Sequence, residues 1–185
     1  MKIKLPTQIE TPRLVLKKHT LDPSYIQLWV DSINQNLSWL SQFLPRFSES
    51  MTFEKEKSFI EGVLTEEKEI GFGIWNKETN ELMGSIGAFN FEEKDQKSSI
   101  ELGIMLFQKY AGNGYAPETM KFLEQELFSV GVDGVMAKID EKNTRSRQAA
   151  QKAGFTWNNQ ETRASRNDDN KLLLVYRKQK SDSRS

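Results

Sequence analysis

Beyond Ser98, apolar runs of strand length alternate with amphipathic segments of helical length. This alternation constrains the fold more than any other feature, because each apolar face must be buried against another element. Strands are predicted over 98–107 and 135–139, from Phe155 onward and over 172–176, and helices over 116–130 and 143–153. The pattern predicts a mixed α/β sheet in a single domain.

The first 97 residues predict an edge strand, helices and a hairpin. The strand covers Arg13–Lys17, and the first helix opens at Asp22-Pro23. A short helix is predicted over 37–44, and Thr52 is expected to cap a third helix. That third helix carries one apolar stripe, formed by Phe59, Ile60, Val63 and Leu64. Apolar runs over 72–74 and 82–88, separated by a polar turn, predict the hairpin.

Composition excludes several classes of protein. Of the 185 residues, 37% are hydrophobic, which is enough for a buried core and excludes intrinsic disorder. The 26 basic residues balance the 26 acidic ones, so no overall field attracts nucleic acid or an anionic membrane. The absence of cysteine excludes disulfides and thiolate metal sites. Without a spanning apolar run or a secretory signal, a cytoplasmic protein that needs no metal is expected.

The segment Ala111–Glu118 carries the strongest chemical signal. It lies between a predicted strand and a predicted helix, and Gly112 and Gly114 allow its backbone to approach a ligand closely. The helix start adds unpaired N–H groups and the positive end of the helix dipole, so the segment can cradle a phosphate or pyrophosphate. A dinucleotide fingerprint would need Gly or Ala where Pro117 stands, and the Gly-Lys-Ser/Thr of a P-loop is missing.

Several segments together resemble the GNAT superfamily of acyl-CoA N-acetyltransferases, in the branch that acetylates the amino termini of ribosomal proteins. The matching segments, in chain order, are Glu10–Leu16, Glu101–Leu106, Gly112–Glu118, and the set Asn143, Ser146 and Lys152–Phe155. The resemblance covers residues 10 to about 177. It departs from the family at Ala111, where Gln or Arg is usual, and at Ile104 and Met105, which replace larger aromatic residues.

The resemblance implies a single GNAT-like domain over 10–177 and a polar tail over 178–185. About six or seven strands, flanked by about four helices, would splay in the middle so that the pantetheine arm of acetyl-CoA lies between strands 98–107 and 135–139. The residues that it assigns to acetyl-CoA binding are Ile104, Met105, Leu106, Ala111, Gly112, Asn113, Gly114, Tyr115, Ala116 and Asn143. Glu101 would be the base or amine-orienting carboxylate, and Ser146 would protonate the departing thiolate.

Each assignment has a structural alternative. Glu101 could face solvent, Asn143 could cap a helix, and Ser146 could allow close helix packing. The lone histidine, His19, is interpreted as a surface or packing residue. The tryptophans 29, 39 and 75 are interpreted as core residues and not as a stacking platform.

The leading function hypothesis is transfer of an acetyl group from acetyl-CoA to a protein α-amine of the ribosomal-protein type, by direct attack on the bound donor. A second hypothesis changes the acceptor to a small amine, such as a polyamine or an aminoglycoside. A third is a catalytically idle acyl-CoA-binding module. The expected partners are the acyl donor and the acceptor amine, without nucleic acid or membrane, and the chain is expected to be a monomer or a homodimer.

Overall fold

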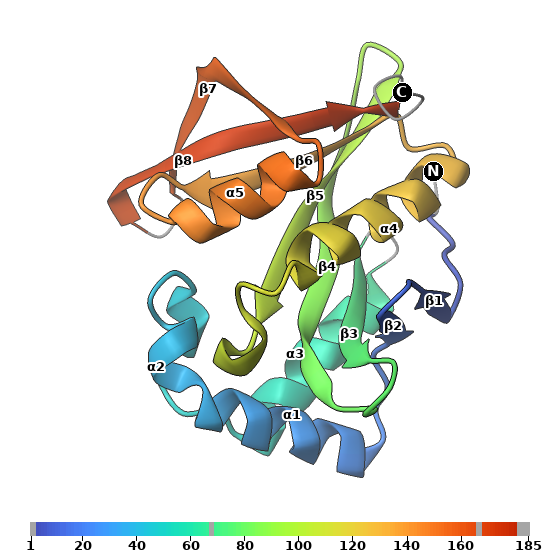
Figure 1. Cartoon of the computed structure of the whole chain (residues 1–185), viewed down its shortest axis with the longest axis vertical. Helices are drawn as coiled ribbons and strands as arrows, with labels where there is room; N and C mark the ends of the chain where they lie inside the picture. The colour runs from blue at the N-terminus through green and yellow to red at the C-terminus, as the bar shows by residue number, and fades with distance from the viewer. Residues whose placement is uncertain (1–2, 67–68, 166–167, 181–185) are drawn as a thin grey trace.

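The computed structural model describes residues 3–66, 69–165 and 168–180. These residues form one eight-stranded mixed sheet in the order β1-β2-β3-β4-β5-β6-β8-β7, with five α-helices (Figure 1). The strands are β1 Gln8–Glu10, β2 Leu14–Lys18, β3 Ile70–Asn76, β4 Leu82–Lys94, β5 Lys97–Leu106, β6 Gly134–Asp140, β7 Thr156–Ser165 and β8 Asp168–Gln179. The helices are α1 Pro23–Gln35, α2 Leu37–Leu40, α3 Phe53–Thr65, α4 Tyr115–Ser129 and α5 Thr144–Lys152.

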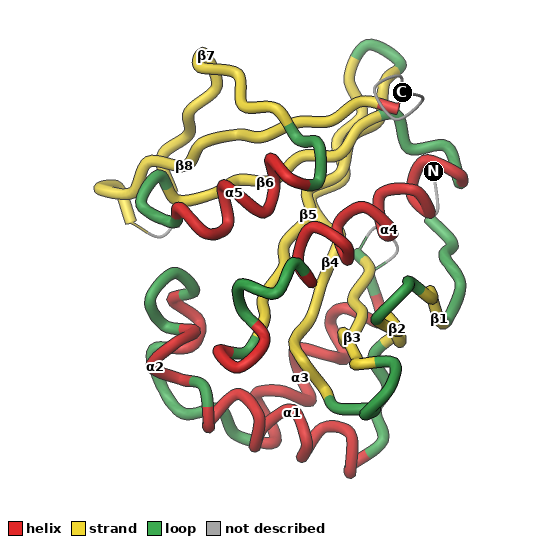
Figure 2. Tube along the Cα trace, viewed as in Figure 1, coloured by secondary structure: helices red, strands yellow, loops and turns green. Residues whose placement is uncertain are grey.

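The two faces of the sheet carry different helices because side chains alternate along each strand. In β2, Leu14 and Leu16 belong to the core that α4 and α5 cover, whereas Val15 packs against the core formed with α1, α2 and α3. Figure 2 shows the helices on the two sides of the strands. Within the described residues, no helix combines the length and the apolar character needed to cross a membrane.

The predicted α/β fold class is confirmed, with more elements than expected. The additional strand, β1, has three residues and a single apolar side chain, Ile9. It is therefore too short to show the alternation of apolar and polar residues that predicts a strand. The helix predicted over 37–44 is real but covers only Leu37–Leu40. The capping prediction for Thr52 holds, because its hydroxyl accepts from the Lys55 N–H. The helix predicted to open at Asp22-Pro23 begins at Pro23, and the Asp22 side chain caps it by accepting from the N–H groups of Ser24 and Tyr25.

Two features differ from the sequence predictions. In α3 only Ile60 of the predicted stripe is fully buried, whereas Phe59 and Leu64 are 41% and 46% exposed. The helix packs against α1 and β3, and these two neighbours leave Phe59 and Leu64 uncovered. The last strand is longer than predicted and runs to Gln179, two residues into the polar segment expected to be a tail. Lys178 is buried there by an ion pair with Glu124 (2.6 Å). Residues 181–185 lie outside the described residues.

His19 is a packing residue, as the sequence suggested. It is 5% exposed, and its Nδ1 lies 2.7 Å from the Tyr25 hydroxyl oxygen. Burial, together with the positive charge of Arg46, lowers the pKa of His19 to about 4. His19 is therefore neutral in the folded protein at neutral pH.

The buried His19 should make the protein less stable in acid. In the unfolded chain His19 titrates near 6.5, so between pH 6.5 and pH 4 the unfolded state binds the extra proton. This group alone should lower the free energy of unfolding by about 3 kcal/mol over that interval. We expect His19→Gln to flatten the dependence of unfolding free energy on pH, measured by urea titration. Parallel wild-type and variant profiles would contradict the assignment.

Candidate active site

A gap between β5 and β6 forms the centre of the site. The two strands run parallel but pair only where Ser99–Glu101 meets Gly134–Met136. Beyond these positions β5 continues to Leu106 and β6 continues to Asp140, and no further pair joins them among the described residues. The splayed pair of strands that the resemblance implied is therefore present.

The backbone of β5 directs polar groups into this gap at alternate residues. Phe107 donates its N–H to the Met83 carbonyl on β4 (2.9 Å), and the alternation of an antiparallel ladder turns Met105 toward β4 as well. Ile104 and Leu106 then direct their N–H and C=O groups toward the gap. Met105, expected to bind the donor with its backbone, is placed to contribute only its side chain.

A cavity of about 520 Å³ occupies the gap and extends from α4 to α2 and α5. The predicted site residues that line it are Glu101, Ile104, Met105, Leu106, Ala111, Gly112, Gly114, Tyr115, Ala116, Asn143 and Ser146. Asn113 is not among the lining residues, and its side-chain amide donates to the Ala111 carbonyl (3.3 Å). The fold therefore brings three of the four resembling segments to one cavity, and Glu10–Leu16 does not line it.

The loop before α4 has the geometry of an anion cradle. Gly112 and Gly114 adopt φ values of +86° and +77°, in the left-handed region that favours glycine. Gly114 is the N-cap of α4, and no side chain of the described residues caps this helix. Nothing lies within 4 Å of where a Cβ on Gly112 would stand. The start of α4 thus lines the cavity and keeps its N–H groups free of a side-chain cap among the described residues, which suits a pyrophosphate.

Arg13 and Glu118, which the sequence analysis did not assign to the site, brace this loop. The Arg13 guanidinium donates to the Asn113 carbonyl (3.1 Å) and to Glu118 Oε2 (2.7 Å), and lies 4.4 Å from the centre of the Tyr115 ring. Glu118, in the first turn of α4, also accepts from the Thr11 hydroxyl (2.6 Å). Arg13 and Glu118 are 105 positions apart in the sequence, so their spacing does not indicate that they are in contact.

The charge of Glu118 is stabilised by its partners. Burial acts to raise the pKa of Glu118, but hydrogen bonds from Thr11 and Arg13 outweigh it and the pKa is lowered. Glu118 is therefore ionised at neutral pH. The loop is held by a charge-assisted pair and not by neutral hydrogen bonds alone.

Glu101 lies at the point where β5 and β6 separate. It is 8% exposed, so the alternative in which it faces solvent is wrong. Its Oε2 accepts hydrogen bonds from the Asn90 amide (2.9 Å) and from the Lys138 ammonium (2.5 Å). The sequence analysis identified neither partner, because each comes from a different strand.

Asn143 and Ser146 lie at the start of α5, on the other side of the gap. The Asn143 Oδ1 accepts from the Ser146 N–H (3.0 Å), so Asn143 is the helix N-cap that the structural alternative described. Both residues line the cavity, which leaves a ligand role open to each.

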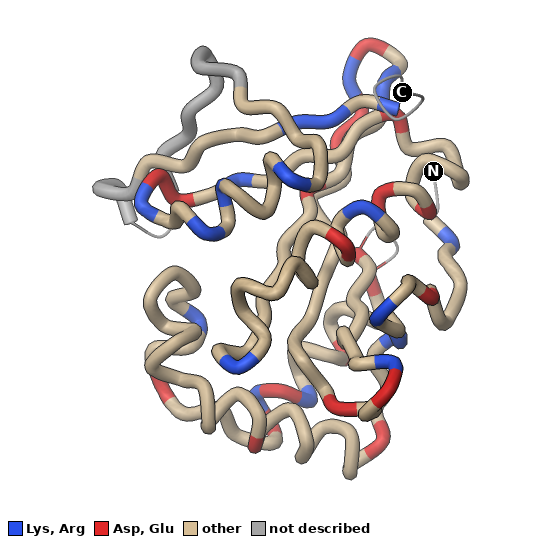
Figure 3. Tube along the Cα trace, in the orientation of Figure 1, with Lys and Arg blue, Asp and Glu red and all other residues tan. Residues whose placement is uncertain are grey.

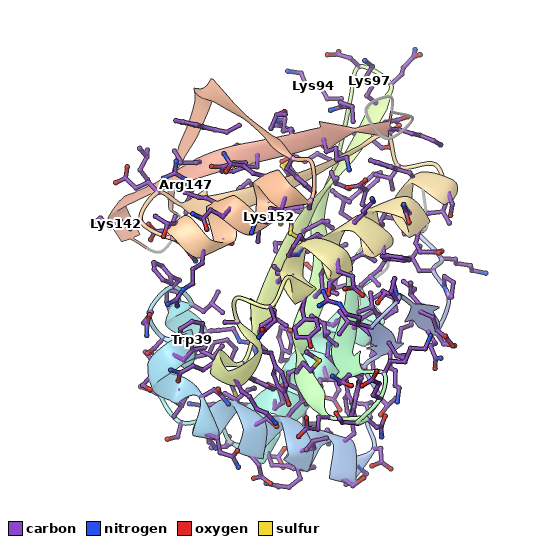
Figure 4. All side chains as sticks on the ribbon, viewed as in Figure 1. Trp39, Lys94, Lys97, Lys142, Arg147 and Lys152 are labelled. Carbon is purple, nitrogen blue, oxygen red and sulfur yellow. The ribbon has the colours of Figure 1, made fainter. Side chains whose placement is uncertain are left out.

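Trp39, expected in the core, lies on α2 (Figure 4), packs only partly buried against the core and also lines the cavity. Its indole N–H donates to the Leu106 carbonyl (2.9 Å), and the Arg145 guanidinium lies 4.6 Å from its ring. Trp29 and Trp75 are buried, as predicted. Trp39 differs because its side chain lies between the core and Arg145 at the start of α5.

A helix start that lines a cavity beside a pair of splayed strands is an arrangement that suits an acyl donor with a pyrophosphate group. The family model described as an acetyltransferase (GNAT) domain matches residues 13–156. The chain belongs to this family and is an acetyl-CoA-dependent acetyltransferase. A comparison with curated protein sequences found no significant match.

Solved structures of similar fold share little sequence with this chain. A RimL ribosomal L7/L12 α-N-protein acetyltransferase in complex with coenzyme A has a TM-score of 0.80 at 18% identity, covering 93% of this chain and 97% of that one. The microcin C7 self-immunity acetyltransferase MccE, in complex with acetyl-CoA and AMP, has a TM-score of 0.82 at 19% identity, covering 96% and 98%. The Salmonella typhimurium enzyme that modifies the N-terminal serine of L7/L12 has a TM-score of 0.76 at 18% identity, covering 95% and 98%.

Because the Arg13–Glu118 pair holds the loop before α4, we predict that Glu118→Gln weakens the binding of acetyl-CoA. Losing the charged partner of Arg13 should loosen the loop before α4, and we expect the dissociation constant for acetyl-CoA to rise about tenfold by calorimetry. Glu61→Gln is the matched control, because it removes one charge from an exposed pair with Lys57 on α3. An unchanged dissociation constant for Glu118→Gln would show that the loop keeps its shape without the brace.

Proposed function

We propose that this acetyltransferase acts on the α-amine of a peptide or protein amino terminus, in the cytoplasm. The observation that carries the proposal is one continuous cavity that joins the open cradle at Gly112 and Gly114 to the buried Glu101 carboxylate. Such a cavity can hold an acyl donor and an amine side by side, which direct transfer requires.

The donor side of the cavity fits acetyl-CoA. Backbone amides at the start of α4 would hold the pyrophosphate, and the polar backbone groups of Ile104 and Leu106 would pair with the pantetheine arm. The Trp39 indole already occupies the Leu106 carbonyl, so the Ile104 groups are the better candidates for this pairing. Ala111 contributes no side-chain contact to the phosphates, so the backbone must supply the affinity.

During the transfer the amine loses a proton and the departing sulfur gains one, so the site needs one group that accepts a proton and another that donates a proton. The amine nitrogen attacks the thioester carbonyl carbon, a C–N bond forms, the C–S bond breaks, and the sulfur leaves with the electron pair. We assign Glu101 to orient the amine and accept its proton, and Ser146 to protonate the sulfur. An α-amine titrates near 8, whereas a lysine amine titrates near 10.4, so the α-amine needs the weaker base.

The charges along the cavity favour an acceptor with one amine over a polycation. The charged lining residues are Glu101, Lys138, Asp140, Arg145 and Lys152, which are two carboxylates and three cations. Figure 3 shows basic residues along α5, beside the gap. A polyamine or aminoglycoside would meet net positive charge, which raises its binding free energy. The activity of the structurally similar RimL enzymes, on the amino terminus of L7/L12, supports the same choice.

The proposed roles predict a specific loss of turnover. We expect Glu101→Gln to lower kcat about 100-fold with serine- or alanine-leading peptides, because the amine loses its proton acceptor. Ser146→Ala should lower kcat in the same direction, and neither change should alter the KM for acetyl-CoA more than about twofold. The measurement is steady-state kinetics with a peptide panel and a polyamine panel.

Glu93→Gln on the exposed arm of β4 is the matched control and should leave both constants unchanged. Turnover of polyamines but not peptides would replace the proposed acceptor with a small amine. Binding of acetyl-CoA without turnover of any amine would support the idle acyl-CoA-binding module instead.

A further inference from the structure

The lining of the cavity contains an ion pair in which the proposed reaction gives a role to Glu101 but none to its partner, Lys138. Lys138 on β6 contacts Glu101 on β5, Nζ to Oε2, at 2.5 Å. The side chains are only 13% and 10% exposed, so water screens their charges weakly. Both residues line the cavity. The pair therefore sets the charge that an acceptor meets at the point where the strands separate.

The contacts on Glu101 are concentrated on one of its two oxygens. Oε2 accepts from Lys138 and also from Asn90, whose backbone has a φ of +52° at an irregularity in the β4–β5 pairing. Oε1 has no hydrogen-bond or ion-pair partner among the residues that the structure describes. One oxygen is thus fixed by a cation and an amide, and the other remains available to a ligand in the cavity.

In this arrangement Glu101 can still accept a hydrogen bond, although Lys138 compensates its negative charge. An ammonium group binds a carboxylate through net negative charge, but Lys138 already supplies the compensating positive charge. The N–H of a neutral amine needs only a lone pair, which Oε1 retains. Glu101 Oε1 can therefore accept a hydrogen bond from a neutral amine, while the ion pair attracts an additional cation only weakly.

We propose that Lys138 is a specificity-determining residue that selects acceptors by charge. The positive charge of Lys138 compensates the negative charge of the Glu101 carboxylate. The site therefore binds an acceptor with a single reacting amine and disfavours one that carries a second ammonium group nearby. The inference rests on the proposed function in that Glu101 contacts the acceptor amine. It adds that the residue which excludes polycations is Lys138.

The test compares Lys138→Gln, which keeps a hydrogen-bond donor but removes the charge, with Lys138→Arg, which keeps both. The readouts are kcat/KM for a serine-leading peptide and for spermidine, and the dissociation constant of spermidine measured by calorimetry with coenzyme A present. We expect Lys138→Gln to shift the kcat/KM ratio about tenfold toward spermidine, and to tighten spermidine binding about tenfold, because Glu101 gains an uncompensated charge. Lys138→Arg should stay within about twofold of the wild type.

Lys142→Gln is the matched control, because Lys142 is exposed, precedes α5 and does not line the cavity (Figure 4). It should leave both readouts unchanged. Equal losses with both acceptors in Lys138→Gln would overturn the proposal, since a purely structural ion pair changes the two alike. The same tenfold shift in Lys142→Gln would also overturn it, because the effect would then come from net charge alone.

A reciprocal variant keeps the test decisive if Lys138→Gln does not fold. Glu101→Gln leaves the Lys138 charge uncompensated and should weaken spermidine binding about tenfold, so unchanged binding would overturn the proposal. If the wild type acetylates no peptide, the proposed acceptor is wrong. The spermidine dissociation constants of the variants still decide the role of Lys138 in that case.

Discussion

The short parallel ladder between β5 and β6 is the constraint on which the rest of the site depends. Three residues of each strand pair, ending at Glu101 and Met136, and the strands then separate. A longer ladder would use the polar backbone groups of β5 for sheet bonding and close the cavity. Because the ladder ends early, the same strand supports the sheet at one end and presents hydrogen-bonding groups to a ligand at the other.

Charged residues stabilise the two ends of this opening. At the cradle, Arg13 and Glu118 join the start of β2 to the first turn of α4. Where β5 and β6 separate, Lys138 and Glu101 join these two strands. Both pairs contain a carboxylate with an exposed fraction near one tenth, so unpairing either carboxylate would leave a poorly solvated charge. The site is therefore held by pairs whose partners come from different elements.

Local signals predicted the framework well. The helix opening at Asp22-Pro23, the cap at Thr52 and the glycines before α4 act within a few residues, where side-chain and backbone hydrogen bonds determine the outcome. Predictions that depended on distant packing were less accurate. Phe59 is exposed although its helix is amphipathic, and Trp39 lines the cavity although tryptophans are usually buried, because neighbouring elements decide which face is covered.

The sequence by itself determined the order of the longer elements, the cradle loop and the family, since these follow from hydrophobic periodicity, turn chemistry and motif spacing over short stretches. Tertiary structure alone decided which charges meet. Arg13 reaches Glu118, and Glu101 reaches both Asn90 and Lys138, across separations that leave no periodic trace in the chain. An ion pair depends on a few ångströms of distance between side chains, and only the packed sheet fixes that distance.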